Sequence, residues 1–409
     1  MNKPIYCGLA FGSVSMDPMG ILRPCCGIVP SKFKSIDDKE FHPIDRINTK
    51  NLREVRKLLS EGVWPETCGM CKNTEDLGSE SMRTIWNKTI PDAPVAEVVN
   101  PADIKYLDLS LGNKCNSKCM TCNPYCSDFW SEEYSTIIPK SIAFSNFAIS
   151  KSTIYQLLDT FKNVRYINLL GGEPMFSDEH RMLLNQLIES GTSKDISISY
   201  VSNLTVYDES LANAWKQFKS VGASLSMDGI GPVNDYLRYP AKFDKIEYNL
   251  KRYLDITNVG EFGITLSCTI SIFNFARFPD LLDYYVSLIE NYDGENASQR
   301  MAIYLNYVNS PAYFNSALLS NEFRKTCLPK LHQVRDRISK MNLHPSLLDS
   351  CNTLEAWANE PQKQDPDAVN NAISFINKSD AYRKRDIKDF IPEVWKELKK
   401  IEREIWQMT

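Results

Sequence analysis

Apolar and polar residues follow two alternating patterns along the middle of the chain. Six short apolar runs have the length and composition of strands: Tyr106–Leu111, Val164–Leu170, Ile196–Val201, Ala223–Met227, Gly263–Ile272 and Met301–Val308. Five segments with helical spacing lie between them: Ser152–Phe161, Arg181–Glu189, Glu209–Phe218, Lys245–Leu254 and Phe278–Ile289. This alternation predicts parallel strands joined by right-handed crossovers. Six units are too few for a closed eight-stranded barrel, so we expect an α/β fold with an open or partial barrel.

Two regions of different character flank this middle part. Residues 1–95 hold short apolar pieces and a charged, helix-prone stretch, and residues 94–103 resemble a linker. After Val308 the pattern is mostly helical, over Asn321–Met341, Leu348–Ala358, Asp367–Asn377 and Pro392–Gln407. We therefore expect domains at 1–95, 104–310 and 311–409, the last being a helical cap packed on the barrel.

Composition and charge exclude several classes of protein. The chain has 409 residues, 43% of them hydrophobic, and a net charge of -4. An acidic balance argues against broad binding to a phosphate backbone, so no nucleic-acid partner is expected. No apolar run approaches the roughly 18 residues that span a bilayer, and no signal-peptide pattern is present at the N-terminus. These observations predict a cytoplasmic protein with no membrane partner.

The cysteines carry the strongest chemical signal. Nine of the 12 lie within the first 126 residues, and in a reducing compartment such clustering favours metal binding or catalysis over disulfides. Cys115, Cys119 and Cys122 directly follow a strand-like run, at intervals of four and three residues. Three thiolates are one too few for a closed structural zinc site. They suit an iron-sulfur cluster that leaves one iron open to another molecule.

A second set of cysteines lies in the N-terminal region. Cys7, with Cys25 or Cys26, and the pair Cys68-x-x-Cys71 supply four thiolates. Four ligands suit a closed site, and zinc and a four-iron cluster both fit by spacing alone. The remaining cysteines after residue 126 are scattered in apolar pattern, which predicts burial in the core: Cys268, Cys327 and Cys351.

Several strand ends then resemble one family. The Cys115-x-x-x-Cys119-x-x-Cys122 pattern is similar to the cluster motif of the radical S-adenosylmethionine (radical SAM) enzymes, and further motifs follow in the family's order. The second predicted strand ends in Gly171, Gly172, Glu173 and Pro174. The third ends at Asn203, and the fourth ends in a segment with Ser226 and Asp228, followed by Arg238. An ordered set of motifs is more specific than one cysteine triplet.

This resemblance implies a partial (β/α)6 radical SAM barrel over residues 104–310, with a 4Fe-4S cluster and S-adenosyl-L-methionine as cofactors. It implies that Gly171–Pro174 meet the methionine amino group, that Arg238 meets the carboxylate, and that Asn203, Ser226 and Asp228 contact the rest of the cofactor. Cys7, Cys25, Cys68 and Cys71 resemble the ligands of the auxiliary SPASM/twitch modules, which implies a second 4Fe-4S cluster, although those modules usually follow the barrel.

The expected function is therefore an enzyme. Reductive cleavage of S-adenosylmethionine would give a 5'-deoxyadenosyl radical that abstracts a hydrogen atom from the substrate, with a donor such as flavodoxin or ferredoxin supplying the electron. A ribosomally made peptide is the first expectation for the substrate, and a free amino acid, sugar or nucleoside derivative is the alternative. A non-catalytic iron-sulfur or zinc protein that binds a partner is the rival from another class. No hydrogen-donating or other catalytic side chain is assigned.

Overall fold

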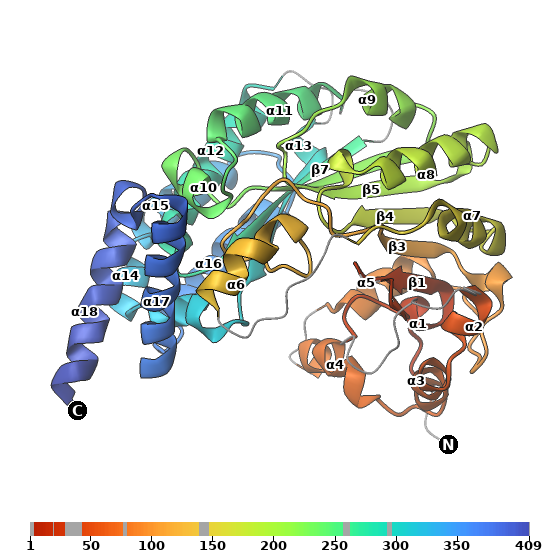
Figure 1. Cartoon of the computed structure of the whole chain (residues 1–409), viewed down its shortest axis with the longest axis horizontal. Helices are drawn as coiled ribbons and strands as arrows, with labels where there is room; N and C mark the ends of the chain where they lie inside the picture. The colour runs from red at the N-terminus through yellow and green to blue at the C-terminus, as the bar shows by residue number, and fades with distance from the viewer. Residues whose placement is uncertain are drawn as a thin grey trace. The chain divides into compact units, whose positions relative to one another are not determined.

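The computed structural model describes residues 4–18, 20–28, 43–76, 80–138, 147–256, 262–292 and 297–408. Within these ranges helices and mainly parallel strands alternate along the chain (Figure 1), so the predicted α/β class is confirmed. The strands are β1 (Ser13–Met16), β2 (Leu22–Arg23), β3 (Tyr106–Ser110), β4 (Tyr166–Leu170), β5 (Ser197–Ser202), β6 (Ser220–Ser226), β7 (Phe262–Ile270) and β8 (Met301–Tyr307).

All six predicted strands are present, as β3 to β8, within a few residues of the expected bounds. The order in the sheet is β2-β1-β3-β4-β5-β6-β7-β8. The pairs β1–β3, β3–β4, β4–β5 and β7–β8 are parallel, as the alternation with helices predicts, and β1–β2 is antiparallel. Strands β1 and β2 were not predicted. They come from the N-terminal region, so the sheet extends beyond the six expected units.

Among the described residues of the middle part, the five predicted helices are present, and two short helices that were not predicted lie among them. They are α7 (Lys151–Thr160), α8 (Asp178–Glu189), α9 (Glu209–Trp215), α10 (Pro232–Leu237), α11 (Phe243–Ile256), α12 (Phe278–Glu290) and α13 (Ala297–Arg300). The N-terminal region contains α1 (Gly8–Gly12), α2 (Pro43–Ile47), α3 (Lys50–Ser60), α4 (Gly69–Asp76) and α5 (Met82–Thr89), and α6 (Ser131–Ile137) follows the Cys115–Cys122 segment. The C-terminal helices are α14 (Asn321–Lys325), α15 (Leu328–Ile338), α16 (Ser346–Asn359), α17 (Pro366–Arg383) and α18 (Pro392–Met408).

The chain divides into two compact units. The first comprises residues 1–115, 146–201 and 209–221, and the second comprises residues 116–145, 202–208 and 222–409. The division falls between Cys115 and Asn116, inside the cysteine motif. Each unit is therefore described by itself.

In the first unit, one face of the sheet carries a ladder of polar side chains at matching register positions. Ser15, Asp108, Asn168 and Ser199 pair in turn across β1, β3, β4 and β5. Ser15 donates to Asp108 at 2.9 Å, Asn168 donates to Asp108 at 2.8 Å, and Ser199 donates to Asn168 at 2.7 Å. Because side chains alternate between faces, the neighbouring leucine and isoleucine residues form an apolar layer on the other face.

The N-terminal region of the same unit has its own small core. Helix α3 turns Leu52, Val55 and Leu59 inward, which is the spacing of an amphipathic helix. Arg56 on the same helix is also buried, and its guanidinium donates to the carbonyl oxygens of Ala10 at 2.9 Å and Ile47 at 2.7 Å. These charge-assisted bonds stabilise the packing of α3 against the segment that leads into β1.

In the second unit, the C-terminal helix α16 packs on strand β8. The ring centroids of Tyr307 in β8 and Trp357 in α16 lie 4.5 Å apart. The Ser346 hydroxyl of α16 accepts a hydrogen bond from the Ile303 backbone N–H at 2.9 Å. Cys268, Cys327 and Cys351 are buried, as their apolar surroundings predict.

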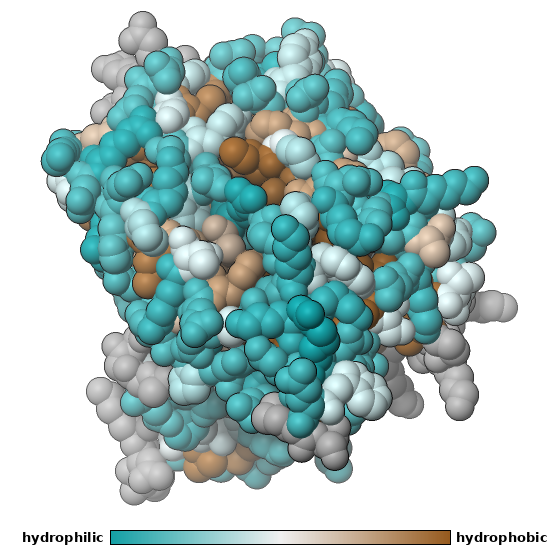
Figure 2. Space-filling model, turned by 90° about the vertical axis from the view of Figure 1, so that its left-hand side faces the viewer, coloured by the Kyte–Doolittle hydropathy of each residue, from teal (hydrophilic) through white to brown (hydrophobic). Residues whose placement is uncertain are grey.

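None of the described helices is long and apolar enough to cross a membrane. The face shown in Figure 2 is mostly hydrophilic, with small separate hydrophobic areas.

Candidate active site

The Gly-Gly-Glu-Pro turn follows β4 in the first unit, and its two glycines are required by geometry. Gly171 has φ +84 and Gly172 has φ +55, a region that favours glycine. A Cβ atom on Gly172 would lie 2.1 Å from the Lys114 carbonyl oxygen, and one on Gly171 would lie 2.7 Å from that of Gly112. The turn therefore lies directly on the backbone that leads into Cys115.

The rest of this turn is equally fixed. The Glu173 backbone N–H donates to the Lys114 carbonyl oxygen at 2.9 Å. The Glu173 side chain is buried and accepts a hydrogen bond from the Met175 backbone at 3.1 Å, while Pro174 begins a short helical turn. Glu173 is thus a buried carboxylate at the carboxyl end of a parallel strand, where α/β proteins bind ligands.

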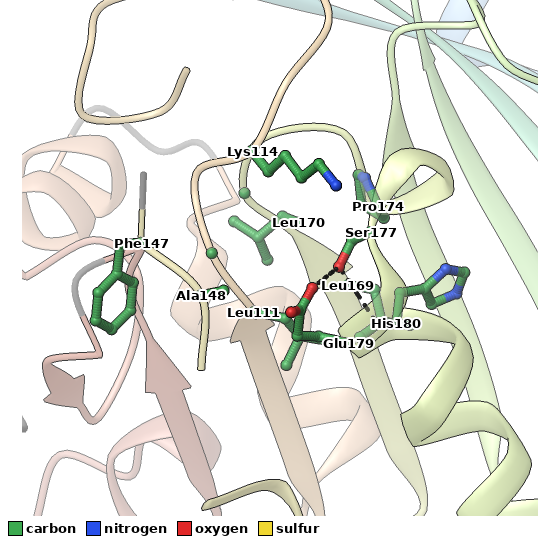
Figure 3. A pocket seen from close by; sticks show the side chains of 12 residues that line it. Leu111, Lys114, Phe147, Ala148, Leu169, Leu170, Pro174, Ser177, Glu179 and His180 are labelled. Atoms are coloured by element: carbon green, nitrogen blue, oxygen red, sulfur yellow. Dashed lines mark hydrogen bonds between the residues drawn. The ribbon is translucent and has the colours of Figure 1, made fainter. Parts of the chain in front are cut away.

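A small cavity adjoins this turn at the ends of β3 and β4 (Figure 3). Its lining includes Lys114, Pro174, Ser177 and Glu179. The Ser177 hydroxyl donates to Glu179 at 2.7 Å and accepts from the backbone of His180 at 3.3 Å, as the dashed lines in Figure 3 show. The cavity therefore places a lysine ammonium and a carboxylate beside the predicted cofactor turn.

In the second unit, Cys119 and Cys122 lie on one tight turn, with the Cys122 backbone N–H donating to the Cys119 carbonyl oxygen at 3.0 Å. The Trp130 indole N–H donates to the same oxygen at 2.7 Å. Burial raises the pKa of Cys119 to about 11, while Arg238 and then Arg383 act in the opposite direction. A hydrogen bond with the Cys126 thiol, followed by burial, raises the pKa of Cys122 well above its usual range.

Asn203 lies in the second unit too, and it holds this cysteine segment. Its amide donates to the Asn116 side chain at 2.9 Å and to the Ser117 hydroxyl at 3.2 Å. Its own side-chain oxygen accepts from the Thr205 backbone at 2.9 Å. The sequence motif indicated a cofactor contact at Asn203, and the structure adds a direct contact with the segment between Cys115 and Cys119.

Two other predicted cofactor residues, Asp228 and Arg238, form a buried ion pair at 2.8 Å. The second carboxylate oxygen of Asp228 accepts from the Thr269 backbone at 2.8 Å. Ser226 is the last residue of β6 and is half-buried. The pair holds one guanidinium and one carboxylate near the end of β6, where the resemblance assigns the cofactor carboxylate and ribose.

The four predicted N-terminal ligands line a single cavity in the first unit. Cys7, Cys25, Cys68 and Cys71 share this cavity with mainly apolar neighbours, among them Leu9, Ile28 and Trp64. Burial, and then repulsion from Cys7 and Cys71, raises the pKa of Cys68 to about 12. Burial, and then repulsion from Cys7, raises the pKa of Cys25.

The donor set of this cavity therefore fits a cationic metal centre. These thiols are half-buried, and thiols that repel one another as thiolates are stabilised in that form when a metal ion lies between them. Cys26, by contrast, does not line the cavity. Its side chain is exposed, and its Sγ lies 3.7 Å from the Sδ of Met82. The geometry favours Cys25 over Cys26 as the ligand from this pair.

Gly69, the residue after Cys68, is not required as a glycine by the backbone geometry. The residue has φ -56, an ordinary helical value, and a Cβ atom there would meet nothing within 4 Å. The Cys68-x-x-Cys71 turn is instead set by the helical hydrogen bond from the Cys68 backbone N–H to the Pro65 carbonyl oxygen, at 2.9 Å. Cys115 is half-buried and is the last residue of the first segment of the first unit. Among the described residues, no three His, Cys, Asp or Glu side chains are already grouped as a metal site.

Comparisons with known proteins gave three results. No family model matches the chain, and no curated protein matches it. Several solved structures match in part. Native anSMEcpe with bound AdoMet and Cp18Cys peptide is 16% identical with a TM-score of 0.40, and the match covers 59% of this chain and 62% of that one.

Two further solved structures give similar figures. Streptococcus suis SuiB bound to the precursor peptide SuiA is 16% identical with a TM-score of 0.37, over 81% of this chain and 66% of that one. The other is the radical S-adenosylmethionine methyltransferase TsrM from Kitasatospora setae, with cobalamin and a [4Fe-4S] cluster bound. It is 10% identical with a TM-score of 0.34, and the match covers 54% of this chain and 36% of that one. The matched structures thus include a radical SAM enzyme, the superfamily that the motifs resemble. At these identities and scores they add no argument about activity, which is argued below from this chain's residues.

Proposed function

We propose that the protein is a radical SAM enzyme whose first cluster is held by Cys115, Cys119 and Cys122. The observation that carries the proposal is the Gly171–Pro174 turn. Its glycines leave no space for a side chain against the backbone before Cys115, and it directs a buried carboxylate to the end of β4. A scaffold protein would need neither feature at this position.

The chain's own residues would bind and orient the cofactor. The backbone at Gly171 and Gly172 permits close approach, and the Glu173 carboxylate accepts hydrogen bonds from an ammonium group. Arg238 supplies a guanidinium for a carboxylate, with Asp228 holding it in place at 2.8 Å. A cluster held by Cys115, Cys119 and Cys122 would supply the electron for reductive cleavage of S-adenosylmethionine, and with it the radical chemistry of hydrogen-atom abstraction.

We infer further that Cys7, Cys25, Cys68 and Cys71 hold an auxiliary four-iron cluster, with zinc as the other occupant that four thiolates accept. Four protein ligands leave no open iron, which favours electron transfer over substrate binding. A ribosomally made peptide is the proposed substrate, following the resemblance to SPASM/twitch modules. A one-electron donor such as flavodoxin or ferredoxin is the proposed partner, and the cytoplasm is the proposed location.

The test uses full-length protein reconstituted anaerobically with iron and sulfide. We expect about eight irons per chain, four for each cluster, and production of 5'-deoxyadenosine after dithionite and S-adenosylmethionine are added. The triple change Cys115→Ala/Cys119→Ala/Cys122→Ala should remove one cluster and all cleavage. Cys351→Ala, a buried cysteine of the core, is the matched control and should retain both. Cleavage that survives the triple change would refute the assignment, whereas zinc in place of half the iron would refute only the auxiliary cluster.

A further inference from the structure

A buried charged group lies behind the Cys119 segment, and it comes from the opposite end of the chain. Arg383, the last residue of α17, and Glu133 of α6 are both fully buried at their side chains and pair at 2.6 Å. Helices α6 and α17 lie side by side in the second unit (Figure 1). A buried pair of this kind costs much of what it gains, because both ions lose their hydration. The pair is therefore weak evidence for stability by itself, and the other contacts of Arg383 show what it holds in place.

The guanidinium of Arg383 reaches the cysteine segment on both sides of Cys119. One nitrogen donates to the Lys118 carbonyl oxygen at 2.8 Å, and another lies 3.5 Å from the Sδ atom of Met120. Arg385 places a second guanidinium nitrogen 3.4 Å from the same sulfur. Met120 itself is buried completely. The residues directly before and after Cys119 are thus held by two arginines.

Several charged side chains on or around this segment form ion pairs. Lys118, Arg383 and Arg385 face two carboxylates, Glu133 at 3.6 Å from Lys118 and Asp380 at 3.3 Å from Arg385. In these ion pairs, three cations share two carboxylates. The other nearby pair, Asp228 with Arg238, is balanced. A positive charge in a region with little solvent is expensive unless a negative group lies close to it.

We propose that Arg383, held in place by Glu133, is a positioning residue that fixes the Cys119 segment (Lys118–Met120), and that the positive charge of Arg383 makes the reduction potential of the first cluster less negative. The inference rests on the proposed function, because it needs a cluster on Cys115, Cys119 and Cys122. Three thiolates give such a cluster a net negative charge that grows when an electron is added. A fixed positive charge nearby stabilises the reduced form more than the oxidised form, and net charge is one of the factors that set these potentials.

Three variants separate charge from geometry. Arg383→Met removes the charge and the fork of donors. Arg383→Lys keeps the positive charge but loses the planar set of N–H donors that the guanidinium provides. Arg383→Met/Glu133→Gln removes both charges, so the net charge is that of the wild type. Arg337→Met is the matched control, since Arg337 is a partly exposed arginine of α15 that pairs with Asp283 and Glu290.

The first measurement is a redox titration followed by electron paramagnetic resonance. It follows the signal that the Cys115→Ala/Cys119→Ala/Cys122→Ala variant lacks. In Arg383→Met we expect a shift to more negative potential equal to at least a tenfold change in the oxidised-to-reduced ratio, about 59 mV for one electron. The double variant and Arg383→Lys should lie close to the wild type. A merely structural role would lower the iron content and leave the potential of the remaining cluster unchanged.

The second measurement needs no cluster. In the apo protein, alkylation of Cys119 is followed by mass spectrometry of the cysteine peptide. Arg383→Met and Arg383→Lys should label roughly tenfold faster than the wild type because the segment opens more often, and Arg337→Met should not. Equal potentials and equal labelling in Arg383→Met and the wild type would overturn the inference. A wild-type protein that binds no iron on these three cysteines would instead refute the proposed function, and the labelling result would still decide the positioning role.

Discussion

Replacing Gly172 by alanine tests whether the turn after β4 is shaped for close backbone contact. The new Cβ would lie 2.1 Å from the Lys114 carbonyl oxygen and 2.7 Å from its carbon, at φ +55. The left-handed backbone costs a non-glycine residue about 1–2 kcal/mol. The contact must also open by more than an ångström, which breaks the 2.9 Å hydrogen bond from Glu173 to Lys114, a loss of about 0.5–1.5 kcal/mol. We therefore expect a loss of about 1.5–3.5 kcal/mol in total.

The displaced residue is the one directly before Cys115, so activity should fall as well. A displacement of about 1 Å in a catalytic arrangement can cost roughly a hundredfold in rate, which we expect in the formation of 5'-deoxyadenosine. Gly191→Ala is the matched control: Gly191 has φ +71, but a Cβ atom there would meet nothing within 4 Å. Urea unfolding and the cleavage assay are compared for the two variants. If Gly172→Ala resembles Gly191→Ala in both, the reasoning about close contact is wrong.

Three other predictions follow from the contacts described above. Cys25→Ala should lose about four irons per chain, whereas Cys26→Ala should keep its full iron content, since only Cys25 lines the four-cysteine cavity. Asn203→Ala should destabilise the cysteine segment by about 1–3 kcal/mol, seen as faster alkylation of the segment's thiols in the apo protein. Glu75→Gln should lower the stability of the folded protein at neutral pH but not in acid. Hydrogen bonding to Arg83 lowers the pKa of Glu75 in the folded state, so the ionised carboxylate stabilises the fold above the unfolded pKa of about 4.3, and this stabilisation is lost as the pH falls through the folded pKa. Urea titrations at several pH values would show the difference between the variant and the wild type.

The sequence predicted the parts of the fold that local pattern determines. Strands β3 to β8 and the helices between them are long enough to show their periods clearly, and their order follows from the rules of right-handed crossovers. Strands β1 and β2 escaped prediction because they have four and two residues. Runs of that length show no period, and pairing with β3 stabilises β1 at Ser13 to Met16. Tertiary contacts decided these elements, not local propensity.

For the candidate site, sequence motifs identified residue types but not their physical reasons. Gly69 and Gly172 both stand in motifs, yet only Gly172 has a conformation and a contact that require glycine. Arg383 could not be found from sequence at all. It lies 250 residues from its partner Glu133 in a helix that carries no motif, and nothing in its local pattern separates it from a surface arginine such as Arg337.

Several contacts described above reach the cysteine motif through residues other than its cysteines, which changes how the motif is to be understood. Gly172 and Glu173 act on the Lys114 carbonyl, Asn203 on the side chains of Asn116 and Ser117, and Arg383 on the Lys118 carbonyl. None of these contacts is made with a cysteine sulfur. The fold thus positions the thiols through the residues before and between them, so in this chain the intervening positions are constrained nearly as strongly as the cysteines. Transplanting the three cysteines at the same spacing, without these supporting contacts, would reproduce the ligands but not their arrangement.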